Sequence, residues 1–88
     1  MSDDSLQTII NHIGIEKLYS DVVFNIYYLK INNKTNEDIK ISYVINNDIF
    51  HIKLTTDNFK PICRLAIIEL AEYELYEVCK MAQEILNN

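Results

Sequence analysis

The sequence contains few of the residues that interrupt helices or build phosphate-binding loops. Its 88 residues include one glycine, one proline and no tryptophan. The Gly-rich loops that hold nucleotide phosphates need several glycines at fixed spacing, so the sequence excludes that class of site. It also has no run of 18 apolar residues, and we therefore expect no membrane-spanning segment.

Positive charge is scarce as well. Eight Lys and Arg residues stand against 13 Asp and Glu, which gives a formal net charge of −5, and Arg64 is the single arginine. Proteins that bind nucleic acid over a wide surface neutralise phosphates with clustered cations. We therefore expect no direct binding of nucleic acid.

Length and composition predict one globular domain that covers residues 1–88. Apolar residues make up 49% of the chain and charged residues 24%, a balance that favours a folded core over disorder. The first residues show no secretory signal, and Cys63 and Cys79 lie roughly 24 Å apart on one expected helix, too far for a disulfide. Free thiols fit a reducing compartment, so we expect a cytoplasmic protein.

The pattern of the first residues predicts a short amphipathic helix over residues 3–13. Leu6, Ile9, Ile10 and Ile13 follow the spacing of one helical face. Gly14 stands where a residue with positive φ would close that helix.

Three strands are expected next, in an antiparallel meander. Residues 21–31 are rich in β-branched and aromatic side chains, and residues 39–45 and 49–55 alternate between apolar and polar. Asn46, Asn47 and Asp48 tolerate the positive φ of a tight hairpin turn.

The last part of the chain predicts one long helix over residues 61–87. Pro61 suits its first turn, and a core stripe recurs every three or four positions: Ile68, Ala71, Leu75, Val78, Ala82 and Ile85. At roughly 40 Å this helix exceeds a body about 30 Å across, so it must overhang, bend or lie against another chain. The predicted fold is α+β, a three-stranded meander with both helices on one face (α-β-β-β-α).

That order of elements is similar to the double-stranded-RNA-binding domain and to some small phage-encoded anti-CRISPR inhibitors. The RNA-binding family opens its second helix with a basic cluster, whereas the corresponding helix here offers only Lys60 and Arg64. The resemblance therefore concerns topology alone. Two alternatives stay open: a DNA-mimic inhibitor such as an anti-CRISPR, in which the helix carboxylates occupy the nucleic-acid site of a partner, and an adaptor that resembles the RNA-binding domain.

No catalytic or metal-binding motif is apparent. His12, His51, Cys63 and Cys79 include no pair at the i, i+3 or i+4 spacing of helical metal ligands. We expect neither a metal nor a cofactor, and we do not expect an enzyme.

Two surfaces are candidates for protein binding. On the long helix, the face opposite the core stripe carries tyrosines within an acidic rim, the composition of many interfaces. These partner-binding residues are Leu70, Tyr73 and Tyr76 with Glu69, Glu72 and Glu77. The strand over residues 21–31 is an unprotected apolar edge, which predicts a homodimer interface. Its outer face consists of Val23, Tyr27, Leu29 and Ile31.

These observations predict a small acidic intracellular protein-binding module that associates with itself and with a protein partner. Isoleucine and asparagine, both encoded by A/T-rich codons, fill 25 of the 88 positions. The composition thus favours an accessory or inhibitor protein of a phage, virus or mobile element with an A+T-rich genome.

Overall fold

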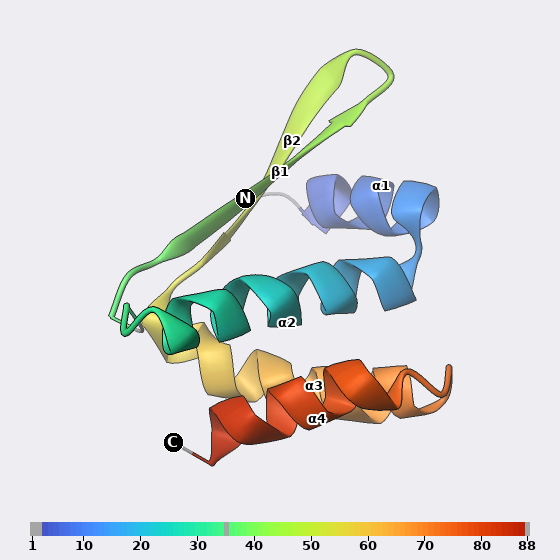
Figure 1. The fold of residues 1–88 in the computed structure, drawn as a ribbon. Coiled ribbons are helices and arrows are strands. Elements are labelled where there is room, and N and C mark those ends of the chain that lie inside the picture. The colour runs from blue at the N-terminus through green and yellow to red at the C-terminus, as the bar shows by residue number, and fades with distance from the viewer. Residues whose placement is uncertain (1–2, 35, 88) are drawn as a thin grey trace.

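Four α-helices and one β-hairpin make up the described part of the chain (Figure 1). The computed structural model describes residues 3–34 and 36–87, with side chains from residue 6 onward. The order is α1 (Asp3–Ile13), α2 (Ile15–Ile31), β1 (Ile39–Ile45), β2 (Asp48–Leu54), the short 3-10 helix η1 (Thr56–Asn58), α3 (Phe59–Ala71) and α4 (Tyr76–Leu86). The class is α+β, as expected.

The predicted three-stranded meander is wrong, because the segment expected as its first strand lies within α2. Leu18, Val22 and Ile26 recur at every fourth residue and are buried together with Val23. Their helical spacing lets one face of α2 pack against α3 and α4. This contact outweighs the preference of β-branched and aromatic side chains for strands. The topological resemblance to the RNA-binding domain is lost with that strand.

The hairpin is confirmed within one residue at its ends. The strands pair antiparallel from Ile39↔Leu54 to Ile45↔Asp48, and a two-residue loop joins them. Asn46 and Asn47 in that loop have φ values of 53° and 68°, the left-handed conformation of a type I′ turn. The two strands are the whole sheet in the described residues.

The predicted single helix over residues 61–87 is also wrong, since residues 72–75 form a turn between α3 and α4. Glu74 has a φ of 60°, and its N–H donates to the Ala71 carbonyl at 3.1 Å. The Leu75 N–H donates to the Leu70 carbonyl at 3.2 Å. These two bonds are those of a Schellman motif, which ends a helix at a left-handed residue. The helix thus bends back on itself, and α4 packs beside α3 (Figure 1).

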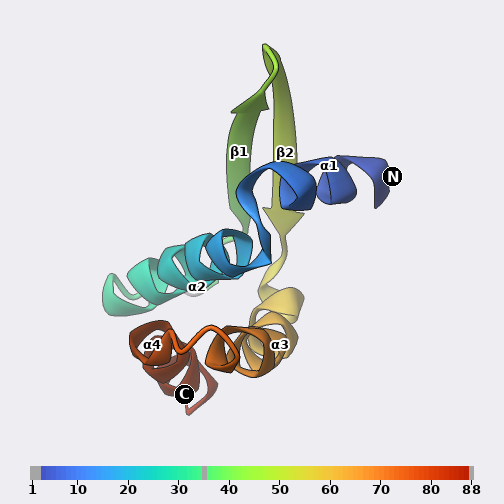
Figure 2. The ribbon, with the colours of Figure 1, turned by 90° about the vertical axis from the view of Figure 1, so that its right-hand side faces the viewer.

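The N-terminal helix has the predicted bounds, and Gly14 separates it from α2. Gly14 has positive φ, as expected, but its φ of 88° and ψ of 155° lie in the extended mirror region that glycine alone adopts readily. α1 therefore turns away from α2 and crosses one face of the hairpin (Figure 2).

The core lies between a helical layer of α2, α3 and α4 and the inward side of the hairpin with α1. Its side chains come from all four α-helices and both strands, and the fully enclosed ones include Ile9, Val23, Ile26, Cys63 and Leu70. The hairpin tip projects away from the helical layer (Figure 1). No helix among the described residues has the length and apolar character needed to cross a membrane.

Candidate interaction surfaces

The histidines and cysteines do not converge on a common site. His12 Nδ1 lies 3.2 Å from the Thr8 carbonyl on α1, and His51 Nδ1 lies 2.8 Å from Ser42 Oγ on the hairpin. Burial raises the pKa of the Cys63 thiol to about 11, so this thiol is neutral at physiological pH and weakly nucleophilic. Within residues 3–34 and 36–87 no three potential metal ligands gather.

The turn between α3 and α4 carries most of the predicted partner-binding residues. Tyr73 and Tyr76 are 48% and 65% exposed, and Glu72, Glu74 and Glu77 beside them are exposed too. We call these five residues the acidic turn. They join two aromatic rings and three carboxylates at one end of the helical layer. Glu74 belongs to this group although the sequence did not single it out.

Leu70 and Glu69 do not belong to that exposed surface. Leu70 is fully buried, which corrects its predicted place on the outer face, whereas Ile68 of the predicted core stripe is exposed. Glu69 is half-buried, and its charge adds to desolvation in raising the pKa of Tyr19. The turn at residues 72–75 is not helical, so α3 and α4 do not continue one helical register. The core stripe that was predicted as one line through both helices therefore gives the wrong buried face in α3.

The four residues predicted for the dimer interface do not share an outward face. Val23 is fully buried in the core. Tyr27 and Leu29 are half-buried, and the Tyr27 hydroxyl donates to Glu84 Oε1 of α4 at 3.4 Å. Only Ile31 is exposed. The alternation of a strand assigned these side chains to one face, but a helix distributes them around its axis.

α2 instead presents a different apolar surface to solvent. Phe24, Tyr28 and Ile31 follow the i, i+4, i+7 spacing and are 47%, 66% and 56% exposed. We call these residues the α2 stripe. It lies opposite the buried side chains of Val22 and Ile26, so α2 is apolar on both faces. If residues 15–31 had been predicted as a helix, the spacing of Phe24, Tyr28 and Ile31 would have indicated the α2 stripe from the sequence.

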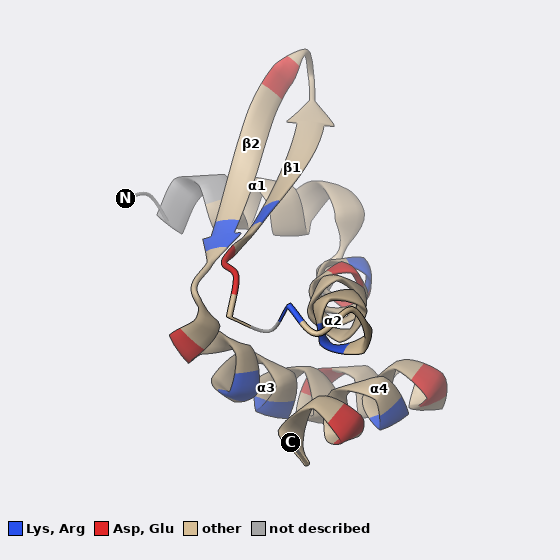
Figure 3. Ribbon diagram, turned by 60° about the vertical axis from the view of Figure 1, so that its left-hand side comes forward, with Lys and Arg blue, Asp and Glu red and all other residues tan. Residues whose placement is uncertain are grey.

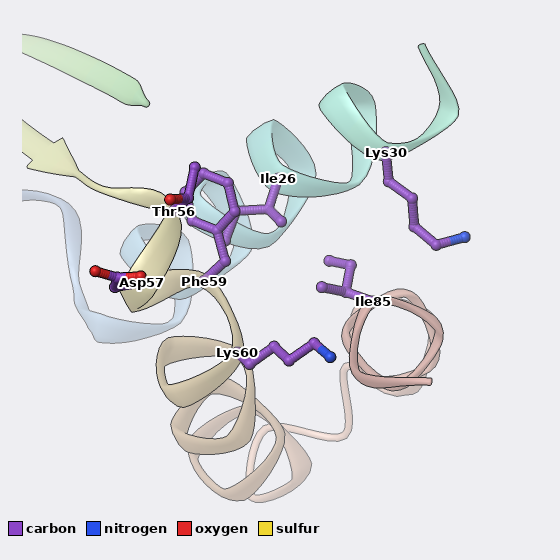
Figure 4. Close-up of a pocket in the computed structure, with 7 residues that line it drawn as sticks. All are labelled: Ile26, Lys30, Thr56, Asp57, Phe59, Lys60 and Ile85. Carbon is purple, nitrogen blue, oxygen red and sulfur yellow. The ribbon is translucent and has the colours of Figure 1, made fainter. Parts of the chain in front are cut away.

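A cavity of about 310 Å³ lies where the C-terminal ends of α2 and α4 meet the start of α3 (Figure 4). Buried Ile26, Phe59 and Ile85 form its apolar floor. Lys30, Asp57 and Lys60 stand around it with both signs of charge. This mixed lining does not favour one ligand class.

A second cavity of about 290 Å³ is a largely apolar groove beside β2. α1, α2 and α3 surround it, and Lys53 is its one cationic residue. Its apolar lining consists of Leu6, Ile10, Ile15, Leu18, Val22, Ile52, Leu54 and Ile62, with Tyr19 beside them. We call this site the β2 groove.

Comparisons of the chain with models of protein families, with curated proteins and with solved structures find no significant match.

Proposed function

We propose that the protein is a small, non-enzymatic protein-binding module of the accessory or inhibitor type, and that it associates with itself. The observation that carries this proposal is the α2 stripe. A phenylalanine, a tyrosine and an isoleucine, each about half exposed, form one continuous face of the central helix. Exposed apolar surface of this kind is typical of protein–protein contact sites.

A second copy of the chain suits this surface. Two α2 helices that cross antiparallel between positions 27 and 28 place Phe24 of one copy against Ile31 of the other. A two-fold contact thus buries the stripe of one copy against that of the other, as a self-complementary interface requires.

The acidic turn suits a different, basic partner. Tyr73 and Tyr76 are rigid aromatic side chains, which lose little conformational freedom when they are buried in an interface. The carboxylates of Glu72, Glu74 and Glu77 steer a cationic surface toward them and set the salt dependence of association. The same three carboxylates are a small acidic surface for DNA mimicry, so we favour a partner that recognises the tyrosines.

Self-association is tested by sedimentation velocity of the full chain and of two matched variants. Tyr28→Lys places a charge in the centre of the α2 stripe, whereas Val44→Lys makes the same kind of change at an exposed apolar residue of the hairpin. We expect the wild type and Val44→Lys to dimerise alike. The dimer dissociation constant of Tyr28→Lys should rise at least tenfold. A monomeric wild type at high micromolar concentration would refute self-association.

The acidic turn is tested by capture from an extract of the host cells with three baits, the wild type and two double variants. Proteins that bind the wild type but not a Tyr73→Ala/Tyr76→Ala variant identify the turn as the docking site. If instead Glu72→Gln/Glu77→Gln abolishes capture while the tyrosine variant retains it, the surface acts through charge and the DNA-mimic alternative is favoured.

A further inference from the structure

The edge of β2 that faces away from β1 has backbone groups with no backbone partner among the described residues. In a two-residue hairpin loop the flanking residues, Ile45 and Asp48, form a hydrogen-bonded pair. Because such pairs alternate along antiparallel strands, His51 and Lys53 direct their N–H and C=O groups outward from the sheet. No described backbone group outside the hairpin bonds to either residue's backbone. An open edge of this kind is a template for another strand.

The β2 groove lies beside this edge. Ile52, Lys53 and Leu54 line it as three consecutive residues, which places it along the strand rather than over one face. A strand added next to β2 would project alternate side chains on the same side as Ile52 and Leu54. Those side chains would enter the groove between Leu6 of α1 and Ile62 of α3.

The outward face of the same strand pair carries two lysines on neighbouring strands. Lys40 and Lys53 are directly opposite each other in the register, and both are exposed. Like charges in this position repel, and neither lysine has an ion pair among the described residues. Figure 3 shows this positive charge at the base of the hairpin, on both strands. A carboxylate that approached on this face would offset the repulsion.

We propose that the β2 edge and the β2 groove bind an extended peptide as a third strand. Apolar side chains of the peptide occupy the groove, and an acidic residue between them lies beside Lys53, with Lys40 one strand further away on β1. Backbone bonds to Lys53 and His51 give affinity, while the groove and the lysines give specificity, the general mode of β-strand addition. This site uses none of the residues of the α2 stripe or the acidic turn, so it stands independently of the proposed function.

The probe is an acetylated and amidated heptapeptide of sequence Ser-Leu-Glu-Leu-Glu-Leu-Ser. Three control peptides each remove one feature. One groups the same residues without alternation, one replaces both glutamates with lysine, and one methylates the backbone nitrogen of each glutamate. Binding is measured by chemical-shift titration of the full-length protein. Hydrogen exchange of the His51 and Lys53 amides reports the strand edge directly.

We expect the probe to shift the groove residues and to slow exchange of the His51 and Lys53 amides at least tenfold. N-methylation should weaken binding at least tenfold, because it removes the peptide's backbone donors. Lys53→Glu should weaken binding about fivefold, whereas Lys80→Glu, the same charge change on exposed α4, should leave it unchanged. Thermal unfolding of both variants shows that the fold is intact.

Three results would overturn the proposal. Equal binding of the probe and of its grouped or N-methylated controls would show non-specific adhesion rather than strand addition. Shifts confined to the α2 stripe or the acidic turn would place the peptide elsewhere. Slow exchange of the Lys53 amide in the peptide-free protein, together with a dimer that survives Tyr28→Lys, would assign the edge to a second copy of the chain.

Discussion

The Tyr43 hydroxyl donates a hydrogen bond of 2.8 Å to Asp21 Oδ2 and so ties the hairpin to α2. Asp21 also accepts from Lys17 Nζ at 3.1 Å, one turn earlier on the same helix. Burial, followed by the bond to Asp21 and its negative charge, raises the pKa of Tyr43. The hairpin has few other neighbours beyond α1, so this contact helps to fix its angle to the helical layer.

Removal of the Tyr43 hydroxyl should therefore destabilise the protein. We expect Tyr43→Phe to lower the free energy of unfolding by about 1–2 kcal/mol, since a half-buried carboxylate loses a hydrogen bond. The measurement is urea unfolding followed by circular dichroism. Tyr28→Phe is the matched control, because the exposed Tyr28 hydroxyl has no hydrogen bond in the described structure, and its free energy should match the wild type.

Alkaline pH should weaken the fold. Burial raises the pKa of Cys63 from 9.0 to about 11, and the pKa of Tyr43 is raised above 10.0. Above pH 9 the unfolded chain releases these protons before the folded chain does, so the free energy of unfolding falls as pH rises. We expect a loss of about 2 kcal/mol from Cys63 between pH 9 and 11.

Unfolding in urea at pH 7, 9, 10 and 11 tests whether the free energy of unfolding falls with rising pH and whether Cys63 causes the fall. The Cys63→Ala variant is less stable at neutral pH because it leaves a small cavity, but its free energy should decline less between pH 9 and 10. A wild-type free energy that rose over this range, or an unchanged slope in Cys63→Ala, would contradict the assignment to this thiol.

The hairpin was predictable because its determinants are local. Alternation from Ile39 to Ile45, and again from Phe50 to Leu54, fixes which side faces the core, and Asn46-Asn47 supplies both left-handed residues of the turn. Neither feature depends on the rest of the chain. The helix over residues 3–13 was predictable for the same reason, since its apolar spacing and Gly14 are contiguous in sequence.

α2 was not predictable from local preference. Residues 21–31 satisfy the composition of a strand, but Val22 and Ile26 together with the preceding Leu18 also follow the spacing of a helix. Which pattern prevails depends on a partner surface, and that surface is built by α3 and α4 far along the chain. The exposed positions of the α2 stripe were missed with it.

The acidic turn was predicted in part. Tyr73, Tyr76, Glu72 and Glu77 are exposed as expected, because polar and aromatic residues around a helix end tolerate solvent. The burial of Leu70 was not predicted, since Glu74 is a good helix former and gives no signal of a break. The long helix instead bends where α4 gains contact with both α2 and α3.

Glu74 should be a site where glycine stabilises the fold. Its φ of 60° is strained for a residue with a Cβ atom, and glycine adopts this conformation without that cost. We expect Glu74→Gly to raise the free energy of unfolding by about 0.5–1 kcal/mol. The control is Glu77→Gly in the first turn of α4, where ordinary helical geometry makes glycine destabilising by a similar amount. A less stable Glu74→Gly would contradict the left-handed turn.

Leu70 is buried whereas the neighbouring Tyr73 and Tyr76 are exposed, so their truncation should affect stability very differently. Leu70→Ala removes a fully buried side chain and should lower the free energy of unfolding by about 2–5 kcal/mol. Tyr73→Ala and Tyr76→Ala, at exposed positions of the acidic turn, should each change it by less than about 1 kcal/mol. The three variants are compared in urea at pH 7. If Tyr76→Ala cost as much as Leu70→Ala, that ring would be part of the core, and the acidic turn would lose one of its two aromatic contacts for a partner.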